Sequence, residues 1–297
     1  MPSYETLKFE KDPAGFAVIT LNRPASLNAI SVQMYHELQV VFNEVMKDKD
    51  IKAFIYTGSP RTDGRPCFSA GMDLKEVAKG IHYDHPELKG PFYLEQDVMF
   101  PPNSAEGKLW RMRPRLPVNP VFMPHVWAPK VSIAAVDGVA TAGGIELALC
   151  CDIILASETA QFSDMHVKNL GVGIGGGVVT ANLAYRVGVA MAEEICFLGE
   201  PINGREAERI GLANHCYAPD KLLPAAKEMA RKIAAKRLGA VSITKLSCRS
   251  IYDMSYNESW AYGDRLLEET PFEPGGPGVG DGARDWESKQ QTRERSK

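Results

Sequence analysis

Residues 131–151 read VSIAAVDGVATAGGIELALCC. The apolar run Val131–Val136 has the composition of a buried strand and ends at the turn-forming pair Asp137-Gly138. A glycine pair, Gly143-Gly144, then opens a helix-like run whose single carboxylate is Glu146. This succession of strand, turn and helix is typical of an α/β protein, and the rest of the chain repeats it.

The start of this helix predicts a chemical site. The first N–H groups of a helix have no partner within the helix and lie at the positive end of its dipole. Gly143 would let a ligand oxygen approach without a Cβ in the way. Glu146 is three residues further on and therefore lies on the same helix face. Such an arrangement suits the stabilisation of a developing oxyanion beside a group that moves a proton.

Composition narrows the class of protein. The 297 residues are 44% hydrophobic and 24% charged, as in a soluble protein with one large domain or one domain and an appendage. The net charge of −3 disfavours a nucleic-acid partner. Six cysteines without a CxxC pair indicate reduced thiols. The sequence has no signal peptide and no membrane-spanning run, so we expect a cytoplasmic protein without a membrane partner.

Working outward, alternating strand and helix patterns predict a core over residues 1–217. Strand-like runs are 4–10, 15–21, 51–57 and 152–156, and helical runs are 31–47 and 178–185. A helical C-terminal region, 218–297, is predicted to hold helices at 221–236, 240–254 and 257–269, a Gly/Pro-rich linker and a tail helix. Nine prolines interrupt the pattern within 80–129, and the aromatic residues among them predict an ordered lid or pocket insert.

Six short motifs, in a fixed order along the chain, carry a family resemblance. They are NRPASLN (22–28), CFSAGMDLK (67–75), GVATAGGIE (138–146), CDIILA (151–156), AQF (160–162) and GREAERIGL (204–212). Each motif is weak alone, but together over residues 5–217 they resemble the crotonase (enoyl-CoA hydratase/isomerase) superfamily. The resemblance implies a spiral of ββα units with a helical C-terminal region used in trimer packing.

The resemblance also implies a substrate and its binding residues. The expected substrate is an acyl-CoA thioester, so that CoA enters the site as part of the substrate. We expect no permanently bound cofactor and no metal, and assembly of the protein as a homotrimer or hexamer. Two backbone N–H groups, carried onto Ala70 and Gly143, would hold the thioester oxygen and stabilise an enolate. CoA would lie along two segments, which contribute Ala25, Ser26 and Leu27, and Ala70, Met72, Asp73 and Leu74.

The proton-handling residues depart from the family pattern. Glu146 matches one of the two glutamates of the hydratases, but His166 stands where the second glutamate is expected. Hydration needs one group that takes a proton from water and another that protonates Cα. Histidine can do either near neutral pH, so His166 is the candidate partner. Asp164, two residues earlier, could orient His166 or lie on the opposite side of a strand-like stretch.

Three functions remain open from the sequence. The first is an enoyl-CoA hydratase or isomerase, acting on a bulky or cyclic acyl group because the insert implies a shaped pocket. The second is a C–C bond hydrolase of cyclic β-diketones or β-keto acyl-CoA, in which His166 helps to activate water. The third is a CoA-binding member that has lost activity along with its second glutamate.

Overall fold

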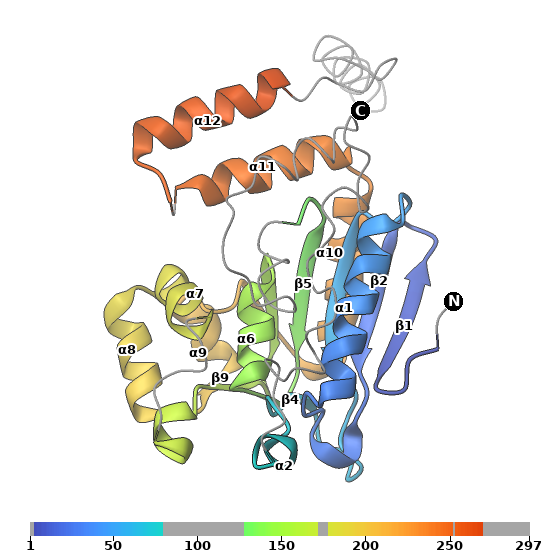
Figure 1. Ribbon diagram of the computed structural model, residues 1–297, viewed down its shortest axis with the longest axis vertical. Helices are drawn as coiled ribbons and strands as arrows, with labels where there is room; N and C mark the ends of the chain where they lie inside the picture. The colour runs from blue at the N-terminus through green and yellow to red at the C-terminus, as the bar shows by residue number, and fades with distance from the viewer. Residues whose placement is uncertain (1–2, 80–127, 172–177, 252, 270–297) are drawn as a thin grey trace, which may run out of the picture.

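A computed structural model describes residues 3–79, 128–171, 178–251 and 253–269. Its larger sheet has six strands in the order β1-β2-β3-β5-β7-β10 (Figure 1). The strands are β1 (Leu7–Asp12), β2 (Phe16–Leu21), β3 (Ala53–Gly58), β5 (Val131–Val136), β7 (Ile153–Ser157) and β10 (His215–Tyr217). β1 pairs antiparallel with β2, and the other neighbours in this sheet are parallel.

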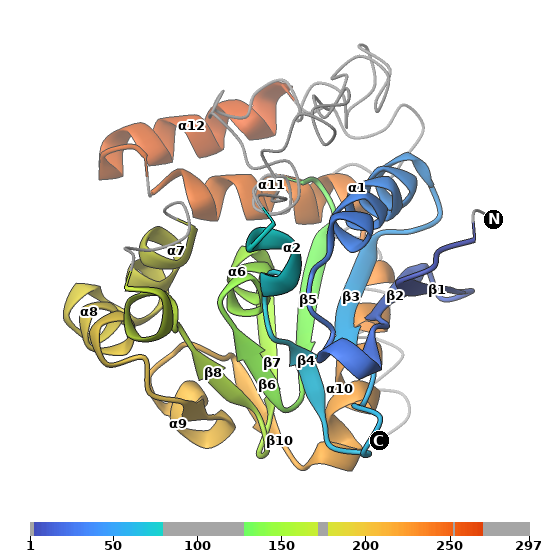
Figure 2. The ribbon, with the colours of Figure 1, turned by 60° about the horizontal axis from the view of Figure 1, so that its bottom comes forward.

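A second, four-stranded sheet positions the candidate site. Its order is β4-β6-β8-β9, and Figure 2 shows β4, β6 and β8 side by side. The strands are β4 (Cys67–Ser69), β6 (Val139–Thr141), β8 (Gln161–Ser163) and β9 (Ile202–Asn203). β4, β6 and β8 are parallel, so their carboxyl ends lie at one edge, whereas β9 runs antiparallel to β8.

Helices cover both faces of the larger sheet (Figure 1). α1 (Val32–Lys47) and α6 (Gly143–Cys150) lie on one face, and α10 (Pro219–Ala234) packs on the other against β3, β5 and β7. Successive residues of a strand point to opposite faces, so Phe54 joins the core beneath α1 while Ile55 joins the core beneath α10. Burial on both faces explains why the inner strands β2, β3, β5 and β7 are mostly apolar, whereas the edge strand β1 is not.

The remaining helices surround this core. They are α2 (Leu74–Val77), α7 (Val178–Val187), α8 (Val189–Leu198), α9 (Gly204–Arg209), α11 (Leu238–Ser250) and α12 (Tyr256–Glu269). Two shorter turns of helix are η1 (Pro24–Ser26) and η3 (His166–Leu170), the latter a π-helical turn. In Figure 1, α11 and α12 lie together above the upper end of the larger sheet.

Buried side chains satisfy the ends of α1. Ser31 accepts a hydrogen bond from the Met34 N–H and so caps the start of the helix. At the other end, the buried Lys130 Nζ donates to the carbonyl oxygens of Val45 and Asp48, at 2.6 and 2.5 Å. The ammonium group thus neutralises the negative end of the helix dipole, and it joins α1 to the start of β5.

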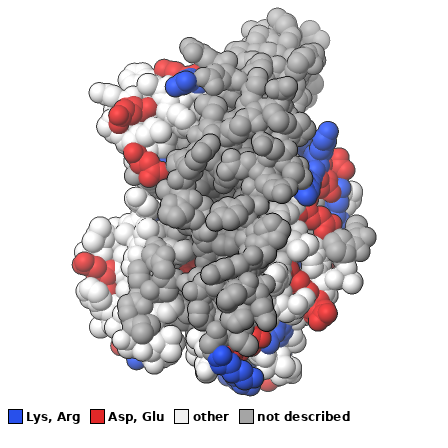
Figure 3. Space-filling model, in the orientation of Figure 1, with Lys and Arg blue, Asp and Glu red and all other residues white. Residues whose placement is uncertain are grey.

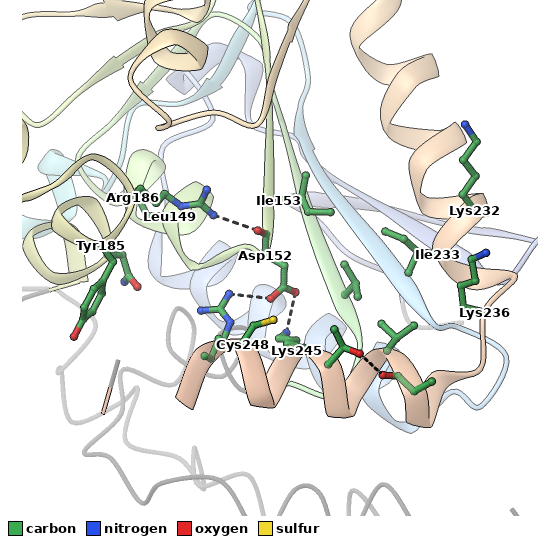
Figure 4. A pocket seen from close by; sticks show the side chains of 16 residues that line it. Leu149, Asp152, Ile153, Tyr185, Arg186, Lys232, Ile233, Lys236, Lys245 and Cys248 are labelled. Carbon is green, nitrogen blue, oxygen red and sulfur yellow. Dashed lines mark hydrogen bonds and ion pairs between the residues drawn. The ribbon is translucent and has the colours of Figure 1, made fainter. Parts of the chain in front are cut away.

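A buried ion cluster attaches α11 to the sheet. The Asp152 carboxylate accepts from Lys245 Nζ and from an Arg249 guanidinium nitrogen, each at 2.8 Å, and from the Ser132 N–H at 2.8 Å. Asp152, Lys245 and Arg249 lie in the wall of a cavity of about 920 Å³ between α11, α10 and the sheet (Figure 4). Arg186 of α7 donates to the Asp152 carbonyl oxygen from the same wall.

This cavity contains none of the residues that the sequence points to for catalysis or CoA binding. The Asp152 carboxylate in its wall is occupied by two cations, so it is not free to act on a ligand. We therefore assign the cluster a structural role.

The α/β class and most elements expected from the sequence are confirmed. The strand predicted at 131–136 is observed with those bounds, and the helix predicted over 31–47 is observed as Val32–Lys47. The short strands β4, β6 and β8 were not predicted, because three residues are too few to show a period. The tail helix and nearly all of the 80–129 insert lie outside the described residues, and the division at 217/218 stays a prediction.

The described surface carries mixed charge. On the face drawn in Figure 3, acidic and basic side chains are interspersed over the described part, without one continuous patch of either sign. Among the described residues, no helix is long and apolar enough to span a bilayer. A cytoplasmic location stays a prediction.

The ion cluster yields a stability prediction. Asp152→Asn removes the negative charge that compensates the buried Lys245 and Arg249, so we expect the free energy of unfolding to fall by about 3–5 kcal/mol. The matched control is Asp220→Asn, because Asp220 pairs with Lys221 on the surface and both side chains are largely exposed. The control should change stability by less than about 0.5 kcal/mol. Urea unfolding measures both, and equal effects would contradict the role assigned to the cluster.

Candidate active site

Three loops meet at the carboxyl ends of β4, β6 and β8. Ser69 at the end of β4 is in register with Ala140 of β6, and Thr141 at the end of β6 is in register with Ser163 of β8. The residues that follow, 70–72, 142–146 and 164–166, therefore emerge at one edge. This edge is where ligands bind in sheets of parallel strands. The second sheet thus brings together the catalytic residues predicted from separate motifs.

Glycines let the first two of these loops touch backbone to backbone. Gly71 has a φ of +86°, and a Cβ there would lie 2.8 Å from the Gly143 nitrogen. A Cβ at Gly144 would lie 2.3 Å from the Ser69 carbonyl oxygen. Both distances are shorter than any ordinary contact, so a side chain at either position would push the loops apart. The glycines of the two motifs are required by this mutual approach.

The approach leaves two backbone N–H groups close together. The residue before α6, Ala142, has a φ of +48° and provides no side-chain cap. A Cβ at Gly143 would lie 3.3 Å from the Met72 nitrogen, so the two backbone segments are in contact. Within the described part of the chain, neither the Gly143 nor the Met72 N–H donates a hydrogen bond. The start of α6 is therefore buried and uncapped, with unpaired N–H groups of the kind that bind anionic oxygens at helix starts.

The structure corrects the choice of Ala70 as a donor. The Ala70 N–H donates to the Leu27 carbonyl oxygen at 3.0 Å and is used within the chain. Met72, two residues further on, carries the N–H that remains available. The sequence pattern could not separate the N–H groups of this turn, because the positive φ of Gly71 decides which way each one points.

The two segments predicted to bind CoA are adjacent. Leu27 accepts from Ala70, the Ile30 N–H donates to the Gly71 carbonyl oxygen at 2.7 Å, and the Asp73 N–H donates to the Ile30 carbonyl oxygen at 3.0 Å. These bonds place Ala25 and Ser26 of η1, with Leu27, beside the 70–74 segment.

Of the residues predicted to bind CoA, Asp73 already has partners within the chain and Leu74 is exposed to solvent. The Asp73 carboxylate is already engaged by Arg23 at 3.0 Å and by the Lys75 N–H. Leu74 is exposed on the first turn of α2. Nothing in these contacts tests whether either residue touches CoA, so both stay predictions.

Glu146 lies one turn inside α6 with its carboxylate buried. Only 5% of the residue is exposed, and its Oε1 has no hydrogen-bond partner among the described residues. Burial raises its pKa to about 7, with a smaller opposing effect from the charge of His166 and a reinforcing one from Asp164. A carboxyl group with this pKa can hold or release a proton near neutral pH, as acid–base catalysis requires.

Asp164 and His166 form a hydrogen-bonded pair directly after β8. Asp164 is fully buried, and its Oδ1 lies 2.5 Å from the Nδ1 of His166. This hydrogen bond, together with the charges of Asp164 and Glu146, raises the pKa of His166 despite its partial burial. His166 opens the π-helical turn η3, an irregularity often found at functional sites. Of the two placements left open by the sequence, the structure thus has Asp164 orienting His166.

Comparison with known proteins places this chain in a family. The family model described as enoyl-CoA hydratase/isomerase matches residues 11–97 and 112–273, which is most of the chain. The chain belongs to the enoyl-CoA hydratase/isomerase family. It is 33% identical over 255 residues to the protein named "Probable enoyl-CoA hydratase echA8" of Mycobacterium leprae, covering 85% of each chain. It is 34% identical over 231 residues to the short-chain-enoyl-CoA hydratase of Clostridium acetobutylicum, covering 77% and 76%.

Solved structures agree with this family assignment. An enoyl-CoA hydratase structure from Geobacillus kaustophilus HTA426 superposes with a TM-score of 0.72 at 26% identity, covering 92% of this chain and 91% of that one. The expected crotonase fold is thereby confirmed, and the protein is an acyl-CoA-processing enzyme of the hydratase/isomerase family. Among the described residues of this family member, no group of three or more His, Cys, Asp or Glu could hold a metal ion.

The raised pKa of Glu146 predicts a pH-dependent stability effect. Between the unfolded pKa of 4.5 and the folded value of about 7, the folded state keeps a proton that the unfolded chain has lost. Stability therefore falls as pH rises through this window and stays lower above it. Glu146→Gln removes the effect, so the variant should gain on the order of 3 kcal/mol relative to wild type between about pH 4.5 and pH 8. Urea unfolding at both pH values measures this, and a constant difference would contradict the buried carboxyl.

The contact between the loops predicts how much stability is lost when a methyl group is added at Gly144. Gly144→Ala forces a Cβ against the Ser69 carbonyl, so we expect a loss of about 1–3 kcal/mol or more in the free energy of unfolding. Gly239→Ala in α11 is the matched control, because a Cβ there meets nothing within 4 Å. The control should be neutral or stabilise by up to about 1 kcal/mol. Thermal or urea unfolding checks the pair, and a tolerated Gly144→Ala would show that the loops can separate.

Proposed function

We propose that this enzyme hydrates or isomerises an enoyl-CoA thioester at the edge formed by β4, β6 and β8. The thioester oxygen accepts hydrogen bonds from the N–H groups of Met72 and Gly143, which stabilise the enolate formed in the reaction. This replaces Ala70, whose N–H is used by Leu27, with Met72. The CoA portion lies along Ala25–Leu27 and the 70–74 segment, which are joined by backbone hydrogen bonds.

The single observation that carries the proposal is the state of Glu146. Glu146 is only 5% exposed, and its carboxylate lacks a partner at Oε1, which is costly to the fold. The residue lies one turn from an uncapped helix start. In hydration, Glu146 takes a proton from water as the oxygen adds to Cβ, and the electron pair of the double bond moves toward the thioester. His166 returns a proton to Cα, so that water is added across the double bond.

The finer features of the substrate and assembly are also proposals. A bulky or cyclic acyl group was inferred from the insert at 80–129, and residues 80–127 lie outside the described part of the chain. Assembly as a homotrimer or hexamer, and the use of the helical C-terminal region in it, follow from the family resemblance. The metabolism of fatty acids or of ring compounds would be the setting of such a reaction.

A C–C bond hydrolase is the second candidate, and the Asp164–His166 pair favours it. A histidine held by a carboxylate is a general arrangement for activating water, which this reaction needs at a β-keto carbon. The buried Glu146 weighs toward hydration, because it supplies a second proton-handling group in the same site. A member without activity is disfavoured for the same reason, since an unpaired buried carboxylate would serve no structural purpose.

Turnover assays separate these functions. Wild-type protein is mixed with a panel of straight-chain, branched and cyclic enoyl-CoA thioesters, and separately with cyclic β-diketones and β-keto acyl-CoA. We expect hydration or isomerisation in the first set. Turnover in the second set alone would replace the leading proposal by the hydrolase.

The variant Glu146→Gln tests the assigned proton transfer. It should lower kcat by about 10²- to 10⁴-fold, the usual contribution of general acid–base catalysis, while binding of the CoA thioester by calorimetry persists. The control Asp220→Asn should retain wild-type kcat. Binding without turnover in the wild type itself, unaffected by Glu146→Gln, would support the inactive member.

A further inference from the structure

We propose that Asp164 is a positioning residue that holds His166 as the proton donor of the reaction, through a hydrogen bond at Nδ1 that leaves Nε2 for the substrate. The inference rests on the proposed function of this site. It assigns a role to a residue that is not part of the glutamate pair of the family.

The hydrogen bond fixes which ring nitrogen can react. Asp164 Oδ1 lies 2.5 Å from His166 Nδ1, and it also lies 3.4 Å from the His166 backbone nitrogen. A carboxylate that accepts from Nδ1–H sets the orientation of the ring and leaves Nε2 as the nitrogen that can exchange a proton. The side chain of His166 is 13% exposed and that of Asp164 is 0% exposed, so bulk water does not screen the pair.

The backbone of Asp164 is held from two sides. It follows Ser163, whose hydroxyl donates to Thr141 Oγ1 at 3.1 Å and ties the end of β8 to β6. On the other side, a Cβ at Gly199, the residue that ends α8, would lie 2.9 Å from the Asp164 carbonyl oxygen. The carboxylate therefore projects from a fixed point, which a positioning residue requires.

The charged groups around His166 come from each element packed on it. Asp164 precedes the η3 turn, and Glu146 faces the pair from α6. Lys168, on η3 itself, directs its Nζ to the Gly199 carbonyl oxygen at 3.5 Å, away from the ring nitrogens. From α8, the Cys196 thiol lies close to Asp164, and burial and this carboxylate raise its pKa to about 11, so it stays neutral.

The surroundings of His166 and Glu146 raise the pKa of both groups, for different reasons. Two carboxylates surround one imidazole, so the imidazolium form is favoured, whereas Glu146 is destabilised as an anion by burial. A charged donor next to a strong acceptor is the state in which hydration begins. During the reaction the proton on Nε2 passes to Cα and the proton from water passes to Glu146. Transfer of a proton from Glu146 back to His166, directly or through water, restores the starting state.

A merely structural role fits Asp164 less well. Its Oδ2 is buried and has no hydrogen-bond partner of good geometry among the described residues, although the Cys196 thiol, a weak donor, lies close to the carboxylate. A carboxylate kept only for folding normally has both oxygens satisfied, because an unsatisfied buried acceptor costs stability. Placement next to a histidine of the site accounts for keeping a fully buried acid at this position.

The first test is a direct titration of His166 that does not depend on turnover. Ring resonances of the six histidines are followed by NMR against pH in wild type and in Asp164→Asn, and the His166 signal is assigned from its loss in His166→Gln. Asparagine keeps an oxygen that accepts from Nδ1–H but removes the charge. We expect the His166 pKa to lie above its ordinary value in wild type and to fall in Asp164→Asn. An unchanged pKa overturns the inference.

The second test is kinetic and uses an acyl-CoA that the wild type turns over. Asp164→Asn should lower kcat on the order of 10- to 100-fold, as part of the acid–base contribution, with KM for the thioester unchanged. The alkaline limb of the kcat–pH profile should move to lower pH, because the donor loses its proton earlier. The control Asp220→Asn should move neither. A fall in activity with an unmoved alkaline limb would make Asp164 structural and overturn the positioning role.

The two proposals can fail separately. Wild-type protein that turns over no enoyl-CoA, yet shows the His166 titration and its shift in Asp164→Asn, refutes the hydratase function and leaves the pair intact. If the wild type turns over enoyl-CoA but the His166 pKa does not shift in Asp164→Asn, the positioning role of Asp164 is refuted and the proposed hydratase function stands. Unfolding curves of Asp164→Asn, run alongside, verify that the variant is folded at the pH values used.

Discussion

The close approach of two backbone segments, without side chains between them, is the constraint on which the site depends. The turn after β4 and the start of α6 touch at Gly71, Gly143 and Gly144, where added methyl groups would meet backbone atoms. This contact places the Met72 and Gly143 N–H groups close together at the carboxyl edge of the second sheet. The helix begins directly after Ala142, whose backbone has a strained positive φ and whose side chain provides no cap.

The second constraint is the burial of the ionisable side chains of Glu146 and Asp164, which suits them to acid–base chemistry but lowers the stability of the fold. Glu146 is buried without a partner at Oε1, and its pKa rises accordingly. Asp164 is also buried, and its Oδ1 is hydrogen-bonded to the ring of His166. The same protein uses a buried carboxylate differently at Asp152, where two cations and backbone groups satisfy it and α11 is attached to the sheet. The buried acids of the candidate site thus each keep an oxygen without a hydrogen-bond partner among the described residues, whereas the buried acid that holds the fold together is fully paired.

Much of the fold could be predicted because the larger elements carry a clear period. The runs at 131–136 and 31–47 show it, and the structure has a strand and a helix there. The second sheet could not be predicted in this way, because its strands have two or three residues and their order comes from pairing across the chain. Of the candidate site, Gly143 and Glu146 were identified from local sequence alone, since helix geometry fixes their relation.

The sequence by itself determined the family, the helix start with its carboxylate, and the replacement of a glutamate by His166, because each is a local pattern or a residue type. Only the tertiary structure decided which N–H groups remain free and whether Asp164 meets His166. Ala70 and Met72 stand two residues apart in one turn, and the bond to Leu27, over 40 residues away, removes the first of them as a donor. Hydrogen bonds between segments that are distant in the sequence cannot be predicted from local sequence patterns, so these assignments required the folded structure.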